Sequence, residues 1–141
     1  MKSEKEIHMK KHTILWADDD PDDLMLIREV LVDNHHQHDF VEVNNGKEVL
    51  SFLNDAAKHN NLPCLIVLDM NMPILSGRDT LAILKSKEEF CSIPIVIFTT
   101  SNSELDRMFC NKYGVEMMTK PPEYKALQCI INKMLNICHL S

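Results

Sequence analysis

Residues 64–73 read CLIVLDMNMP, in which an apolar run of five residues is followed at once by Asp69. A continuously apolar run that is rich in branched side chains is typical of a strand buried on both faces of a sheet. Three other apolar runs also end in polar residues, namely ADDDP at 17–21, TTS at 99–101 and TKPP at 119–122. The pattern predicts four strands that end on acids, a hydroxyl group and an ammonium group.

Short β-rich runs alternate with helical patterns five times along the chain. We expect strands near residues 12–17, 39–43, 64–68, 94–98 and 115–118, and helices near 21–35, 46–58, 77–88, 103–113 and 122–138. Alternation at this spacing predicts βαβ units and therefore an α/β fold with a doubly wound parallel sheet. Asp20 is placed to cap the first helix, and Ser103 to cap the fourth.

Composition limits the classes of function. The chain has 141 residues, 45% of them hydrophobic, which predicts one domain, over residues 11–138, after a flexible tail at 1–10. A net charge of −6 argues against nucleic acid as a direct ligand, because phosphate backbones require clustered Lys and Arg. The apolar runs are far shorter than the roughly 20 residues of a membrane helix, and no secretory signal is evident, so we expect a cytoplasmic protein.

The five cysteines are an odd number without a Cys-x-x-Cys pair, which favours reduced thiols over a disulfide framework. Cys64 lies in a predicted strand, and Cys129 and Cys138 lie on the last predicted helix, so packing in the core is their simplest role. The histidine-rich segment 35–38 could be interpreted as a metal site. We expect it instead to be exposed at the end of the first helix, where an imidazolium complements the negative end of the dipole.

Ligands of open parallel sheets bind outside the carboxyl ends of the strands, where Asp18, Asp19 and Asp69 are expected. Adjacent strands lie about 4.8 Å apart, so these carboxylates would repel one another unless a cation neutralises them. Mg²⁺ suits such a site, because it takes one or two carboxylates and leaves oxygens free for a phosphoryl group. Capping of the first helix explains Asp20 but leaves Asp69 unexplained.

Thr99 and Lys120 end the other two strands. Taken singly, a threonine at a strand end is a common β-former and a surface lysine is usually solvated. Together with a metal-bound carboxylate they fit covalent catalysis by an aspartate nucleophile, which needs no separate base. The product would be an acyl phosphate on Asp69, which adds roughly two negative charges to the pocket.

Through these residues the chain resembles the response-regulator receiver domains of two-component signalling, most of all the stand-alone receivers found beside bacterial histidine kinases and phytochromes. The resemblance runs through ILWADDDP (14–21), VLDMNMP (67–73), IPIVIFTTS (93–101) and TKPP (119–122) and covers residues 11–138. It implies a flavodoxin-like (βα)5 fold with a five-stranded sheet in the order 2-1-3-4-5. It also implies that Asp69 accepts a phosphoryl group from the phosphohistidine of a sensor histidine kinase, with Mg²⁺ as cofactor.

The resemblance also implies the roles of single residues. Asp19 would bind Mg²⁺ directly, Asp18 would act largely through metal-bound water, and Asn71 would contribute its backbone carbonyl. The implied metal ligands are thus Asp18, Asp19, Asp69 and Asn71, and the implied catalytic residues are Asp69, Thr99 and Lys120. Met117 departs from the family, which often has an aromatic residue three positions before the lysine, so any switch there would use a thioether.

Such a protein is a phosphoacceptor rather than an enzyme, since it catalyses only its own phosphorylation and dephosphorylation. We expect a monomer or weak dimer that signals by docking, either to a phosphotransfer histidine domain or to a regulatory target, with no nucleic-acid or membrane partner. Phe109, Met108, Met117 and Met118 are candidate contacts, although each could equally pack in the core.

Two other functions remain open. A phosphohydrolase like the haloacid dehalogenases also uses an aspartate nucleophile, but it needs a second aspartate two positions later, where this chain has Asn71. A receiver-like interaction module that never takes phosphate is the other alternative. Loss of a pocket residue would have favoured it, but all of them are present in the sequence.

Overall fold

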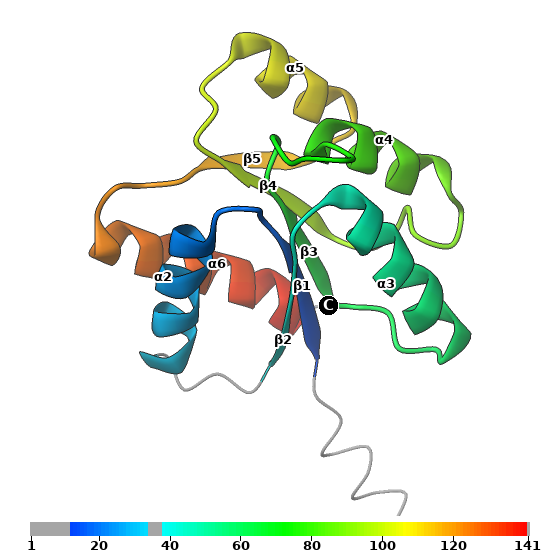
Figure 1. Cartoon of the computed structure of the whole chain (residues 1–141), viewed down its shortest axis with the longest axis horizontal. Coiled ribbons are helices and arrows are strands. Elements are labelled where there is room, and N and C mark those ends of the chain that lie inside the picture. The colour runs from blue at the N-terminus through cyan, green and yellow to red at the C-terminus, as the bar shows by residue number, and fades with distance from the viewer. Residues whose placement is uncertain (1–11, 34–37, 141) are drawn as a thin grey trace, which may run out of the picture.

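The computed structural model describes residues 12–33 and 38–140 as one five-stranded parallel sheet flanked by helices (Figure 1). The strands are β1 (Thr13–Ala17), β2 (Asp39–Val43), β3 (Leu65–Leu68), β4 (Ile95–Thr99) and β5 (Glu116–Thr119). The helices are α2 (Pro21–Asp33), α3 (Gly46–Lys58), α4 (Gly77–Ser86), α5 (Glu104–Lys112) and α6 (Tyr124–Leu140). The strand order is β2-β1-β3-β4-β5, which confirms the predicted fold.

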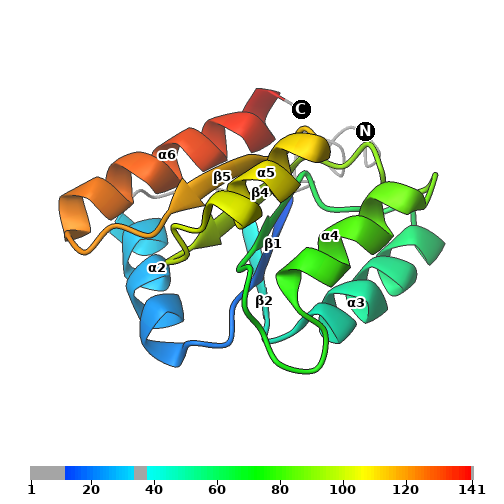
Figure 2. The same ribbon diagram turned by 90° about the horizontal axis from the view of Figure 1, so that it is seen from above.

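Helices cover both faces of the sheet (Figures 1 and 2). Successive strand side chains point to opposite faces, so Ile14 and Trp16 pack with α2 and α6, whereas Leu15 and Ala17 pack with α3 and α4. Every residue of β1, β3 and β4 is buried. Burial on both faces is why these strands read as continuous apolar runs in the sequence.

Most element boundaries lie within two residues of those expected from the sequence. The last helix begins at Tyr124 rather than at 122. Asp20 and Ser103 cap α2 and α5 as predicted, since each side chain accepts a hydrogen bond from a backbone N–H of the first turn. The predicted tail at 1–10 and residues 35–37 of the histidine segment lie outside the described residues.

The cysteines correct two expectations. Cys64, just before β3, and Cys138, near the end of α6, form a disulfide with their Cα atoms 5.1 Å apart, so the prediction of reduced thiols throughout is wrong. Cys129 was expected to pack in the core but is exposed. Among the residues that the structure describes, no helix combines the length and the apolarity needed to cross a membrane.

Candidate functional site

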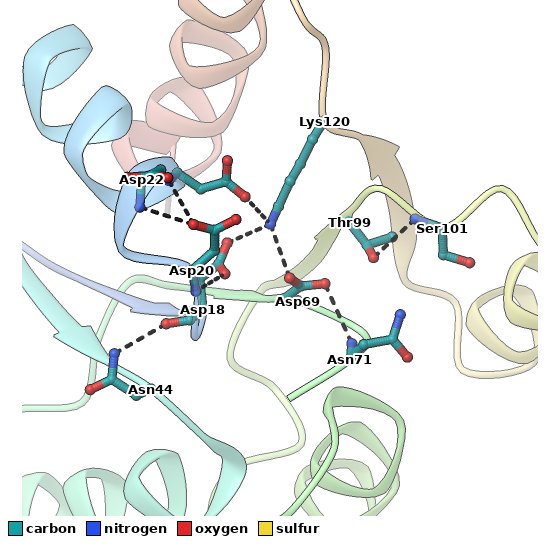
Figure 3. Close-up of polar contacts among 10 residues, drawn as sticks. Asp18, Asp20, Asp22, Asn44, Asp69, Asn71, Thr99, Ser101 and Lys120 are labelled. Carbon is teal, nitrogen blue, oxygen red and sulfur yellow. Dashed lines mark hydrogen bonds and ion pairs between the residues drawn. The ribbon is translucent and has the colours of Figure 1, made fainter. Parts of the chain in front are cut away.

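Backbone pairing brings the predicted site residues to one edge of the sheet (Figure 3). Ala17 pairs with Leu68, so the residues that follow them, Asp18 and Asp69, are neighbours, and the N–H of Asp69 donates to the carbonyl of Ala17 at 3.0 Å. The N–H of Lys120 donates in the same way to the carbonyl of Thr99 at 2.8 Å. The sheet ladder therefore continues into the candidate site and fixes the backbone of Asp69 and Lys120.

Lys120 lies at the centre of the carboxylates. Its ammonium nitrogen is 2.6 Å from Asp18, 2.8 Å from Asp23 and 2.9 Å from Asp69, and its side chain is only 9% exposed. Burial by itself lowers the pKa of Lys120, but the hydrogen bonds to the three aspartates outweigh it and raise the pKa above its usual value. The lysine is therefore a permanent cation between Asp18 and Asp69.

Asp18 is fully buried beside this cation. Burial raises the pKa of its carboxyl group to about 6, although the hydrogen bonds from Lys120 and from the backbone N–H of Asp20 act in the opposite direction. A carboxylate with a pKa this high holds its negative charge at a cost near neutral pH. A second cation beside Asp18 would therefore stabilise the ionised form.

Three carboxylates at this edge fit a divalent metal ion. Oxygen atoms of Asp18, Asp19 and Asp69 lie within 4.8 Å of one another, so one ion could contact all three. Asp18 and Asp69 are buried, whereas Asp19 is exposed. Hard oxygen ligands that remain open to solvent on one side suit Mg²⁺, which retains several waters when bound to proteins.

The two remaining predicted site residues flank Asp69 (Figure 3). The N–H of Asn71 donates to a carboxylate oxygen of Asp69 at 3.4 Å, which holds the loop after β3 close to the site. Thr99 is fully buried, and its hydroxyl oxygen accepts a hydrogen bond from the N–H of Ser101 at 3.2 Å. The hydroxyl hydrogen of Thr99 therefore stays available for a further acceptor.

A close backbone approach supports the loop that carries Asp69. A Cβ atom on Gly77, the first residue of α4, would lie 1.9 Å from the carbonyl oxygen of Asp69, so only glycine fits here. The N–H of Gly77 also donates to the carbonyl of Met70 at 3.0 Å. Helix α4 therefore starts directly against the backbone of the central aspartate.

Several contacts around the site were not predicted from the sequence. Asp23 is one of the three partners of Lys120, and its position in the first turn of the helix that Asp20 caps was the available signal. Asn44 donates to the carbonyl of Asp18 at 3.3 Å, and the position of Asn44 just after β2 was the only hint of this contact. Nothing in the neighbouring sequence indicated that Asp106 on α5 would be buried.

The candidate docking residues divide between surface and core. Met108 on α5 is 61% exposed, as a contact residue would be. Phe109 and Met117 instead pack, partly buried, against the core on the α3–α4 side of the sheet, and Met118 packs against the core on the other side. Met108 is thus the one residue of this set whose side chain is mainly exposed.

Comparisons with known proteins agree with this geometry. A family model described as the response regulator receiver domain matches residues 14–132. The response regulator Rcp1 of Synechocystis sp. is 35% identical over 95 residues, which span 66% of this chain and 65% of Rcp1. The chain therefore matches just under two thirds of the length of this relative.

Solved structures with the same fold include two that are at least 30% identical. The phosphorylated cyanobacterial phytochrome response regulator RcpA has a TM-score of 0.78 at 31% identity, covering 88% of this chain and 91% of RcpA. The Mn²⁺-bound form of Rcp1 has a TM-score of 0.76 at 30% identity, covering 86% of this chain and 90% of Rcp1. One of these similar proteins thus holds a phosphoryl group and the other a divalent metal ion.

Proposed function

Because the chain belongs to the response regulator receiver family, we propose that it is a phosphoacceptor of two-component signalling whose Asp69 takes a phosphoryl group from a histidine kinase. The observation that carries this proposal is the group of buried charges at the sheet edge. Lys120 bridges Asp18 and Asp69 at 2.6 and 2.9 Å, and these two carboxylates together with that of Asp19 fit one metal ion. Phosphorylated RcpA and Mn²⁺-bound Rcp1 support the same interpretation.

The proposed reaction is a direct transfer to a carboxylate oxygen of Asp69. The oxygen attacks the phosphorus atom, the new O–P bond forms as the N–P bond of the phosphohistidine breaks, and the electron pair stays on the imidazole nitrogen. No separate base is needed, because the carboxylate is already ionised. Asn71 stands two residues after Asp69 and has no titratable group, which disfavours the acid–base step of a phosphohydrolase.

Mg²⁺ held by Asp18, Asp19, Asp69 and the backbone carbonyl of Asn71 would neutralise the charge that develops on the phosphoryl oxygens. Lys120 would move its hydrogen bond from Asp69 to the new phosphoryl group, because transfer converts the ionised carboxylate into a neutral acyl oxygen. Thr99 would donate its free hydroxyl hydrogen to a second phosphoryl oxygen.

The output would be a change of docking surface. Phosphorylation would shift a two-state equilibrium that is read on α5, β5 and α6 by a regulatory target or by a phosphotransfer histidine domain. Leu105 and Met108 on α5 are 71% and 61% exposed, so α5 presents apolar side chains to such a partner. We propose a receiver domain over residues 11–138 that acts as a monomer or weak dimer.

Incubation with acetyl phosphate and Mg²⁺, followed by intact mass spectrometry, tests the proposal. We expect one phosphoryl adduct that depends on Mg²⁺ and is lost in Asp69→Asn. Asp55→Asn, which changes an exposed acid on α3, should label like the unmodified protein. An adduct that persists in Asp69→Asn, or turnover of a generic phosphoester to inorganic phosphate, would contradict the proposal. Turnover of the phosphoester would favour the phosphohydrolase interpretation instead.

A further inference from the structure

Asp106 is a buried acid that lies outside the group of Asp18, Asp19 and Asp69 and has no role in the mechanism above. Asp106, in the first turn of α5, is 6% exposed. One of its carboxylate oxygens accepts from the guanidinium of Arg78, and the other accepts from the hydroxyl of Ser101 at 2.6 Å. The free-energy cost of burying a carboxylate is far smaller when both oxygens have a partner than when neither has one. The contacts with Arg78 and Ser101 therefore favour this one arrangement of Asp106.

Ser101 connects Asp106 to the proposed site. While its hydroxyl donates to Asp106, its backbone N–H donates to the hydroxyl oxygen of Thr99 at 3.2 Å (Figure 3). The N–H of Ser103 donates to the Ser101 hydroxyl oxygen at 3.3 Å. The bonds to α5 and its capping residue therefore hold the loop at Ser101 in place, and the backbone N–H of Ser101 in that loop lies beside Thr99.

Arg78 connects the same carboxylate to the loop of Asp69. It follows Gly77, which lies against the carbonyl of Asp69, and its guanidinium carbon lies 5.1 Å from the centre of the Phe109 ring on α5. Arg78 is therefore held between a carboxylate and an aromatic face. Asp106 therefore joins two segments by two hydrogen bonds: the loop after β4, through Ser101, and the start of α4, through Arg78.

We propose that Asp106 is a positioning residue that, through Ser101, orients the Thr99 hydroxyl toward the phosphoryl group. This inference rests on the proposed function. A hydroxyl oxygen that accepts the Ser101 N–H keeps its own hydrogen for a different acceptor, and a phosphoryl oxygen on Asp69 would be such an acceptor. Without the anchor, the loop at Ser101 is held less tightly, its backbone N–H moves away from the Thr99 oxygen, and the Thr99 side chain populates several rotamers instead of one.

The simpler interpretation is that Asp106 only complements the dipole of α5 and joins two helices. An acid in the first turn of a helix is common for that reason. That role explains the negative charge but not the burial, and it does not require the bond to Ser101. It predicts a loss of stability in variants of Asp106, without any change in the rotamer of Thr99.

Two readouts separate these interpretations in Ser101→Ala, which removes the hydroxyl but leaves the Arg78–Asp106 pair intact. The first is the Thr99 rotamer, measured without metal from the methyl couplings in NMR spectra. The second is the rate of phosphorylation by acetyl phosphate at saturating Mg²⁺. We expect rotamer averaging and a rate about tenfold lower, the effect of one hydrogen bond to a charged group, with unchanged Mg²⁺ affinity.

Three further variants sharpen the test. Ser101→Thr keeps the hydroxyl and should restore both readouts. Asp106→Asn should slow phosphorylation in the same way, and the double variant Ser101→Ala/Asp106→Asn should be no slower than the more affected single variant, because both act through one path. Ser86→Ala removes a serine hydroxyl that bonds the carbonyl of Ile83 at the far end of α4 and should leave both readouts unchanged.

A single Thr99 rotamer and a normal rate in Ser101→Ala would overturn the inference. So would failure of Ser101→Thr to restore them, or an equal loss in Ser86→Ala. The two proposals fail separately. If the unmodified protein is not phosphorylated on Asp69, the proposed function falls, whereas the Thr99 rotamer still decides whether Asp106 and Ser101 orient the hydroxyl.

Discussion

Replacement of Asp18 by asparagine should stabilise the metal-free protein at neutral pH. Burial raises the pKa of Asp18 from 3.8 to about 6 in the folded state, so the folded protein binds this proton more tightly than the unfolded chain. The corresponding stability is fully present below the unfolded pKa of 3.8 and is lost as the pH rises through about 6. The lost stability is on the order of 3 kcal/mol, from about 1.4 kcal/mol for each pH unit between the two values.

The asparagine side chain of Asp18→Asn would resemble the protonated acid, so this variant avoids the cost. The change also weakens one contact of Lys120, which keeps Asp23 and Asp69 as partners. We therefore expect Asp18→Asn to match the unmodified protein near pH 4 and to be more stable by about 1–2 kcal/mol near pH 7.5, after allowance for the weaker contact. Added Mg²⁺ should reverse the order, because it binds the folded unmodified protein more tightly.

Urea unfolding in the presence of a chelator, followed by the fluorescence of Trp16, measures the unfolding free energies of Asp18→Asn and of the unmodified protein at each pH. Trp16 is the single tryptophan of the chain and is 2% exposed in the folded state, so its emission should shift on unfolding. Asp55→Asn serves as the control, since this acid is exposed. The reasoning is refuted if the difference between Asp18→Asn and the unmodified protein is the same at both pH values, or if Asp18→Asn is the less stable near pH 7.5.

Three further changes follow from single contacts. Gly77→Ala should cost about 2 kcal/mol of unfolding free energy and slow phosphorylation, because its Cβ would meet the carbonyl of Asp69 at 1.9 Å; an unchanged urea midpoint would argue against this close approach. Lys120→Met should raise the Mg²⁺ affinity severalfold in calorimetry, since the metal no longer competes with a buried cation, and equal affinity would contradict that competition. Reduction of the Cys64–Cys138 disulfide should lower the unfolding free energy by about 2–4 kcal/mol, and a thiol assay in denaturant without reductant should find three free thiols of the five cysteines. Five reactive thiols would rule the disulfide out.

Local signals in the sequence were sufficient to place the strands and helices, whereas the strand order came from the resemblance to receiver domains. The runs that became β1, β3 and β4 are apolar throughout because both faces of the sheet are covered, and capping residues such as Asp20 and Ser103 mark where helices begin. The sequence could predict that the candidate site residues lie close together, because each directly follows or ends a strand and parallel strands bring those ends together. Asp69, Thr99 and Lys120 needed no long-range information beyond the strand order.

Contacts between distant elements were decided only in three dimensions. Asp23 and Lys120 are separated by 97 residues, Cys64 and Cys138 by 74, and Arg78 and Asp106 by 28. Charges and thiols at such separations have no period or spacing that links them, since a helix face or a strand end specifies a direction and not a partner. What the chain alone determines is where its polar groups leave the sheet. Only the packing of α2, α4, α5 and α6 around that sheet determines which of those groups meet, because their distances depend on how the helices dock.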